Sequence, residues 1–177
     1  MLSAHGPYAA WASWLDAFAR GEDLPLNHLV PIDEELGAHM RGRLLVRLEA
    51  AFRARANLWA DALRRHLAAV PARAPGDLRP VLVAARNRLQ PLRALAVDPR
   101  LPGDLQTALA DALRGMVAEA QESLENSARR QRQGAAEILA VIRENHLLAA
   151  LTAPAAAGTP PGSQSPSPFP AGRRVIL

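Results

Sequence analysis

The residues that could carry acid–base or metal chemistry are scattered along this sequence. The histidines stand at positions 5, 28, 39, 66 and 146, and the chain contains no cysteine. Glu35 and His39, four residues apart on one expected helix face, have the spacing closest to a metal-ligand pair. A dimetal helical bundle needs Glu-x-x-His motifs on two helices and two further glutamates, and no Glu-x-x-His motif occurs. We therefore predict no metal site and no cofactor.

No motif with a known catalytic mechanism occurs either. The sequence lacks a Gly-rich phosphate loop, a Gly-x-Ser-x-Gly nucleophile elbow and a His-Glu-x-x-His zinc motif. The absence of cysteine removes disulfides, thiolate catalysis and cysteine-based zinc sites. Glu34 and Glu35 are expected in the first turn of a helix, where carboxylates favour the positive end of the helix dipole. These observations predict a protein that is not an enzyme.

Arginine supplies the whole positive charge of the chain. All 21 basic residues are arginine, and the net charge is only +4. Codon bias of a GC-rich bacterial genome explains this composition, and arginine-driven binding of phosphate or carboxylate is the alternative. No aromatic residue interleaves the most basic stretch, 71–100, so nucleic-acid binding is possible but not favoured. The candidate anion-binding residues are Arg86, Arg88, Arg93, Arg129, Arg130 and Arg132.

The composition and periodicity predict an all-α fold. Aromatic residues make up 4% of the chain, and good strand formers are few. Apolar residues recur at helical spacing in 7–20, from Asp33 to about Val70, and from Asp77 onward with a break at Pro91. We expect an elongated antiparallel helical bundle of about four helices over residues 1–151. Residues 152–177 are rich in Pro, Ser and Gly and predict a flexible tail.

The stretch 104–151 is the element around which we expect the bundle to form. Asp104 is a candidate N-cap, no proline follows until Pro154, and apolar residues follow a heptad seam, as in a coiled coil. The stretch therefore predicts one very long helix or two helices joined by a hinge. Its middle, 125–133, is polar on all sides, and three explanations remain open: an extension into water, a hinge at Gly134, or a buried polar layer.

Three apolar surfaces are candidates for binding a partner protein. The N-terminal helix concentrates aromatic side chains, which either cover the bundle as a lid or dock on another chain. The end of the long stretch is apolar and needs a packing partner. The C-terminal peptide resembles a short linear motif that could add a strand to a sheet edge. The candidate partner-binding residues are Trp11, Trp14, Phe18, Ile138, Val141, Ile142, Leu148, Arg173, Arg174, Val175, Ile176 and Leu177.

These features predict a non-catalytic interaction or assembly subunit of a larger bacterial protein complex. Its expected partners are other protein subunits, in a homo- or hetero-oligomer. The alternative is a regulatory helical protein that binds an anionic ligand or nucleic acid through arginine-rich helix faces. The sequence shows no signal peptide and no apolar run long enough to span a membrane, so we expect a cytoplasmic protein.

Overall fold

The computed structural model describes residues 6–33, 36–69 and 75–152, and these ranges contain helices and no strand. The all-α prediction is confirmed. In this part of the chain, none of the helices combines the length and the apolar character that a membrane crossing requires. In chain order the helices are α1 (Pro7–Ala19), α2 (Ala38–Ala68), α3 (Leu78–Arg88), α4 (Gln90–Ala96), α5 (Gly103–Arg129), α6 (Ala135–Glu144) and α7 (Ala149–Thr152).

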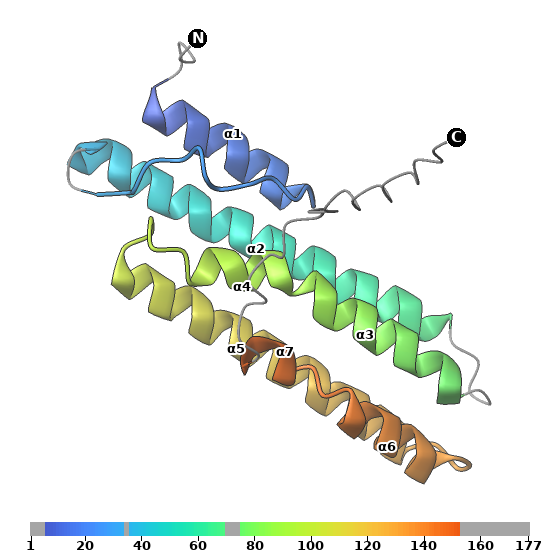
Figure 1. The fold of residues 1–177 in the computed structure, drawn as a ribbon. Helices are drawn as coiled ribbons and strands as arrows, with labels where there is room; N and C mark the ends of the chain where they lie inside the picture. Colours follow the sequence, from blue (N-terminus) through green and yellow to red (C-terminus); the bar gives the residue numbers. More distant parts are fainter. Residues whose placement is uncertain (1–5, 34–35, 70–74, 153–177) are drawn as a thin grey trace, which may run out of the picture.

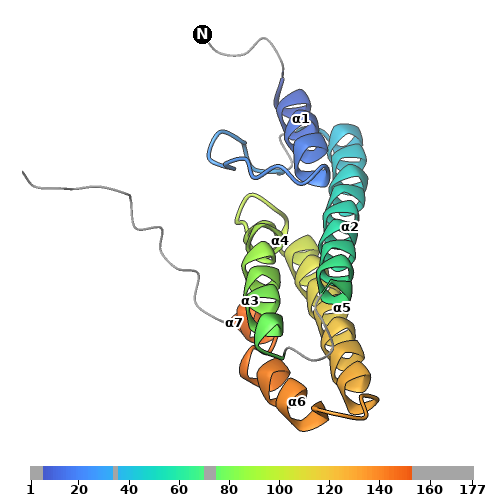
Figure 2. The same cartoon turned by 90° about the vertical axis from the view of Figure 1, so that its right-hand side faces the viewer.

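The helices form an elongated bundle with two layers. Helices α2 and α5 lie in one layer, helices α3, α4 and α6 lie in the other, and α1 packs against the first half of α2 (Figure 2). The direction of the chain alternates from α2 to α3–α4, to α5 and to α6 (Figure 1). Leucines dominate the core between the layers because each helix presents an apolar stripe inward. Fully buried examples are Leu44, Leu48, Leu82, Leu92 and Leu95.

The predicted long helix over 104–151 is wrong as a single element, and the hinge alternative is correct. Helix α5 ends at Arg129, and Gly134 adopts a left-handed conformation with φ of 72° immediately before α6. Residues 125–133 are mostly polar and have no apolar stripe that could pack along the core. Residues 138–148 have such a stripe. Folding α6 back onto α5 buries that apolar stripe. Among the described helices the longest is α2, with 31 residues.

Asp33 and Asp104 are not the N-cap residues of α2 and α5, and α2, α3 and α5 have no side-chain hydrogen bond at their N-caps. Helix α2 begins at Ala38, five residues after Asp33, and Gly37 precedes it with φ of 78°. Asp77 directly precedes α3 but has a helical backbone, whereas a capping side chain needs an extended one to reach the first turn. Asp104 lies inside the first turn of α5, whose N-cap is Pro102. The predicted break at Pro91 is confirmed, since α3 ends at Arg88 and α4 starts at Gln90.

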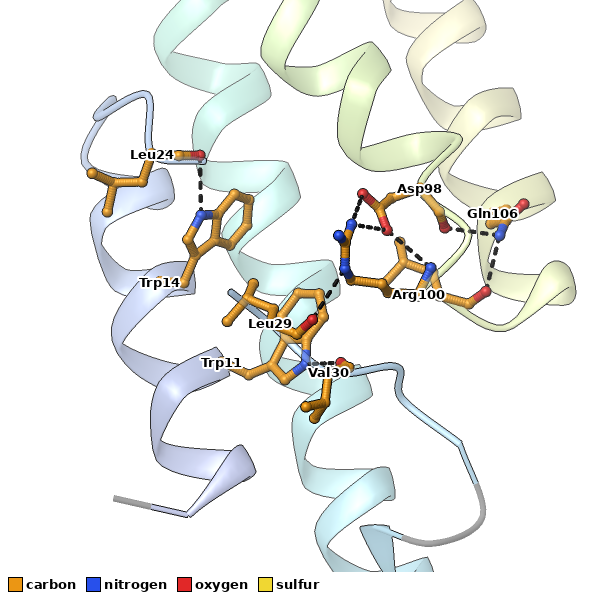
Figure 3. A network of polar contacts seen from close by, with 9 residues as sticks. Trp11, Trp14, Leu24, Leu29, Val30, Asp98, Arg100 and Gln106 are labelled. Atoms are coloured by element: carbon orange, nitrogen blue, oxygen red, sulfur yellow. Dashed lines mark hydrogen bonds and ion pairs between the residues drawn. The ribbon is translucent and has the colours of Figure 1, made fainter. Parts of the chain in front are cut away.

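The connector between α1 and α2 packs against the bundle and buries Leu29 and Ile32. The indole N–H of Trp11 donates to the carbonyl of Val30 at 2.8 Å, and that of Trp14 donates to the carbonyl of Leu24 at 3.2 Å (Figure 3). At the far side, the Ile32 amide donates to the Arg100 carbonyl at 2.8 Å. The connector therefore links α1 to the turn between α4 and α5.

That turn is held by a partly buried ion pair. Asp98 is 7% exposed, and its carboxylate accepts hydrogen bonds from the Arg100 backbone amide at 2.9 Å and from the Arg100 guanidinium at 2.9 Å. The Arg100 Nε donates to the Leu29 carbonyl at 3.1 Å. Gln106 adds hydrogen bonds to the carbonyls of Asp98 and Leu101, both at 2.9 Å (Figure 3). One network thus fixes the connector, the turn and the start of α5.

Candidate functional site: a groove between α2 and α5

An apolar groove lies between α2 and α5. The two helices run in the same direction (Figure 1). The volume of the groove is about 410 Å³. The two helices meet only over a limited length, so their side chains leave a channel along the outer layer of the bundle. The groove is lined by Glu49, Phe52, Arg53, Ala56, Asn57, Leu105, Ala108, Leu109, Ala112, Leu113 and Met116.

The groove has an apolar floor and a thin polar rim. Phe52 and Leu109 form part of the floor and are each 4% exposed. Ala108 and Ala112 form part of the α5 wall and are exposed, so the side chains at these two positions are small. Arg53 on α2 is exposed and makes no ion pair with any described residue. This arrangement suits an apolar helix with a few polar side chains at its edge.

Sequence reasoning missed this groove because it treated α5 as having a single buried seam. Leu105, Leu109 and Leu113 recur every four residues and face the core. Ala108 and Ala112 lie on the neighbouring face of the same helix, and alanine there reads as an ordinary helix former. The groove could have been predicted from two adjacent faces of α5, one of leucine and one of alanine. Together they make the apolar surface of α5 wider than one seam.

The aromatic side chains of α1 serve the core of the chain itself. Trp11, Trp14 and Phe18 are 0%, 4% and 2% exposed, and Trp14 stacks on Phe18 with the ring centroids 4.9 Å apart. The prediction that they form an exposed docking surface needs correction, because they are buried against α2 and the connector, although Trp14 and Phe18 also border a pocket. The lid alternative matches their position. Large rings fill the volume that the small alanines of α2 leave open.

The apolar residues predicted for docking in 138–148 also turn inward. Ile142 is 2% exposed, and Ile138, Val141 and Leu148 are half-buried against the core. This part of the docking prediction is corrected as well, because α6 packs on α3 and α5. An ion pair between Arg79 of α3 and Glu144 of α6, at 2.7 Å, lies at the surface of the same contact.

A buried polar layer fixes the register between α5 and the segment after α6. Gln121 is 4% exposed, and its Oε1 accepts a hydrogen bond from the Leu147 amide at 3.0 Å. Its Nε2 donates to the Glu125 carboxylate at 3.0 Å, and Arg129 donates to the same carboxylate at 3.0 Å. The polar side chains of 125–133 are exposed or half-buried, so the alternative of a buried polar layer in that stretch is not found. The buried polar residue of this contact is Gln121, one turn earlier.

The Glu125 carboxylate predicts a pH dependence of stability. The hydrogen bond from Gln121 lowers the pKa of Glu125 below its usual value of 4.5; burial opposes this shift, and the charges of Arg129, Arg143 and His146 add to it. A carboxyl whose pKa is lowered by folding stabilises the protein above its unfolded pKa, and this contribution is lost as the pH falls through the folded pKa. We expect Glu125→Gln to be less stable than the wild type at neutral pH.

Urea unfolding at neutral pH and in acid tests this expectation. In acid, below the lowered pKa, the wild-type carboxyl is protonated and the difference between the two proteins should disappear. Glu122→Gln is the matched control, because Glu122 is exposed on the same helix and makes no ion pair with a described residue. A difference between Glu125→Gln and wild type that persists unchanged in acid would contradict the assignment.

The six candidate anion-binding arginines lie in two separate parts of the bundle. Arg86, Arg88 and Arg93 belong to α3 and α4, whereas Arg129, Arg130 and Arg132 lie around the turn after α5, at one end of the molecule (Figure 1). Arg93 donates to the Ala150 carbonyl at 3.3 Å, and Arg129 pairs with Glu125. The structure therefore does not bring the six together in one site.

The predictions for the C-terminal peptide and for metal binding remain to be compared with the structure. The peptide Arg173–Leu177 lies outside the described residues. Within residues 6–33, 36–69 and 75–152, no three histidine or acidic side chains come together in a group that could hold a metal ion. A scan against models of protein families finds no match, and searches of curated proteins and of solved structures find none either.

Proposed function

We propose that this protein is a non-catalytic assembly subunit of a larger bacterial protein complex in the cytoplasm. In this proposal the groove between α2 and α5 binds a helix of another subunit. The observation that supports it is the groove itself, about 410 Å³ in volume with an apolar floor and an alanine wall. We assign partner binding to this groove instead of to α1 and α6, because the apolar side chains of those two helices are buried.

The shape and chemistry of the groove favour a helix as its ligand. A helix presents apolar side chains at intervals of three and four residues, which match the spacing of Leu105, Ala108, Leu109 and Ala112 on α5. Burying apolar surface contributes about 25 cal/mol per Å², and small residues in the wall let the helix axes approach closely. Glu49 and Arg53 are exposed at the rim of the groove. They would favour partner helices that carry complementary polar side chains at their edges, while adding little to the affinity.

Site-specific photo-crosslinking in the cells that make the protein tests this proposal. A photoreactive phenylalanine analogue placed at Ala112 should form an adduct with a helical peptide of a partner subunit, identified by mass spectrometry of the crosslinked peptides. The matched control is the same analogue at Ala140, an exposed alanine of α6 in the opposite layer. An adduct at position 112 that is absent at position 140 supports the proposal, and equal or absent crosslinking at the two positions contradicts it.

A second variant separates binding at the groove from general surface contact. Ala112→Arg places a long charged side chain in the wall, and we expect it to abolish the crosslink formed from a photoreactive residue at Ala108. Ala140→Arg is the matched control and should leave that crosslink unchanged. Circular dichroism of both variants establishes that helix content is retained, since both substitutions replace an exposed helical alanine by arginine, a good helix former.

A further inference from the structure

A second pocket lies on the other side of the bundle, between the connector and the α3–α4 junction. Its volume is about 510 Å³. The stacked rings of Trp14 and Phe18 lie at its base, and connector residues face residues of α3 and α4 across it. The lining residues are Trp14, Phe18, Asp23, Leu24, Pro25, Leu26, Asn87, Gln90, Pro91 and Ala94.

The pocket is suited to an apolar ligand that carries backbone carbonyl groups. Leu24 is 43% exposed, and the exposed side-chain amides of Asn87 and Gln90 make no hydrogen bond with a described residue. The single carboxylate, Asp23, is already paired with Arg55 at 2.5 Å. Two free amide donors beside a flat apolar surface match a polyproline II segment, whose carbonyls are not used internally and whose proline rings need apolar contacts.

The chain itself contains a proline-rich segment after its last described residue. Residues 160–170 include Pro160, Pro161, Pro166, Pro168 and Pro170. Arg93 of α4 donates to the Ala150 carbonyl of α7 at 3.3 Å, so the described chain ends at Thr152 beside the helix that provides Gln90 and Ala94. The eight residues from Thr152 to Pro160 can span up to about 26 Å, whereas α4, with seven residues, is only about 10 Å long.

We propose that the pocket binds the proline-rich segment 160–170 of the same chain. Proline rings contact Leu24, Pro25 and Pro91, and the amides of Asn87 and Gln90 donate to backbone carbonyls of the segment. Because the segment is tethered, its effective concentration at the pocket is on the order of millimolar, so weak contacts suffice for occupancy. This inference concerns a different surface from the α2–α5 groove and does not depend on the function proposed for that groove.

Paramagnetic relaxation in the full-length protein tests the inference. The chain has no cysteine, so Ser165→Cys provides a unique position for a nitroxide label. The amide signals of Gln90, Ala94 and Leu26 should lose most of their intensity, whereas the signal of Ala136 on α6 should not. Replacing the five prolines of the segment by serine, or Ala94→Arg in the pocket, should restore the intensities.

A mixed sample decides whether the segment binds its own chain. Spin-labelled protein without isotope label is mixed with isotope-labelled protein without spin label, and broadening at Gln90 in this sample would mean that the segment of a second copy occupies the pocket. That result overturns the proposal, as does broadening that survives the five proline replacements. Equal intensities throughout the spin-labelled full chain overturn it as well.

Discussion

Replacing Trp11 by alanine is expected to lower the free energy of unfolding by about 3–5 kcal/mol. Trp11 is 0% exposed, its ring meets Trp14 edge to face with centroids 6.1 Å apart, and its N–H donates to Val30 at 2.8 Å. The substitution leaves a large cavity under the connector and removes the donor of that hydrogen bond. For a chain of this size, the midpoint of thermal unfolding should fall by roughly 10 °C.

Two further variants divide this effect into its parts. Trp11→Phe keeps an aromatic ring and removes the N–H, so it should cost about 1–3 kcal/mol, mainly from the carbonyl left without its donor. Ser13→Ala changes an exposed position of the same helix and should stay within about 0.5 kcal/mol of the wild type. Thermal unfolding followed by circular dichroism measures all three. If Trp11→Ala behaved like Ser13→Ala, α1 would not be docked on α2 in solution.

Replacing Asp98 by alanine should have the second-largest effect, about 2–4 kcal/mol. The Asp98 side chain is 8% exposed and that of Arg100 is 27% exposed, so solvent screens this pair only in part. The substitution removes the acceptor of the Arg100 backbone amide and leaves a partly buried guanidinium without its counter-charge. Because Arg100 also contacts Leu29, the loss should reach the connector.

The surface pair Asp111–Arg114 provides the matched control for this prediction. Its side chains are 64% and 70% exposed and its atoms are 3.4 Å apart. Exposed pairs contribute about 0–1 kcal/mol, so Asp111→Ala should barely change stability. Urea unfolding of both variants gives the comparison, and hydrogen exchange at the Ile32 amide, which donates to the Arg100 carbonyl, should accelerate only in Asp98→Ala. Similar losses in the two variants would contradict a structural role for the turn.

The helices and their core faces could be predicted from periodicity, but their ends depended on glycine and on tertiary contacts. The helical spacing of apolar residues from Asp33 to Val70 predicts a buried stripe on α2, in which Leu44, Leu48 and Leu63 are buried, whereas Met40 is 49% exposed. The break after α5 was one of three alternatives, because a glycine at position 134 is compatible with a helix until an apolar segment beyond it gains burial by turning back. Local propensity contains no information about that gain.

The candidate site was less predictable than the fold. Sequence reasoning assigned Trp11, Phe18 and Ile142 to partner binding because large apolar side chains near the ends of a helical pattern have no evident cover. Trp11 and Phe18 are covered by the connector and α2, and Ile142 is covered because α6 packs on α3 and α5. Helical periodicity alone does not show which segments pack together. The groove is formed instead by Phe52 and Leu109 beneath exposed alanines. The width of the gap between two helices depends on how closely they pack, and the local sequence does not determine that distance.

The return of α6 and α7 along the bundle has a practical consequence for experiments on this protein. Residue 152 lies beside α4, on the flank of the molecule and in the layer opposite to α2 and α5 (Figure 2). A fluorescent reporter inserted after Thr152 would therefore emerge from the middle of the rod and away from the α2–α5 groove. Imaging with such a fusion would leave the α2–α5 groove uncovered, so the helix binding proposed there could be followed in living cells.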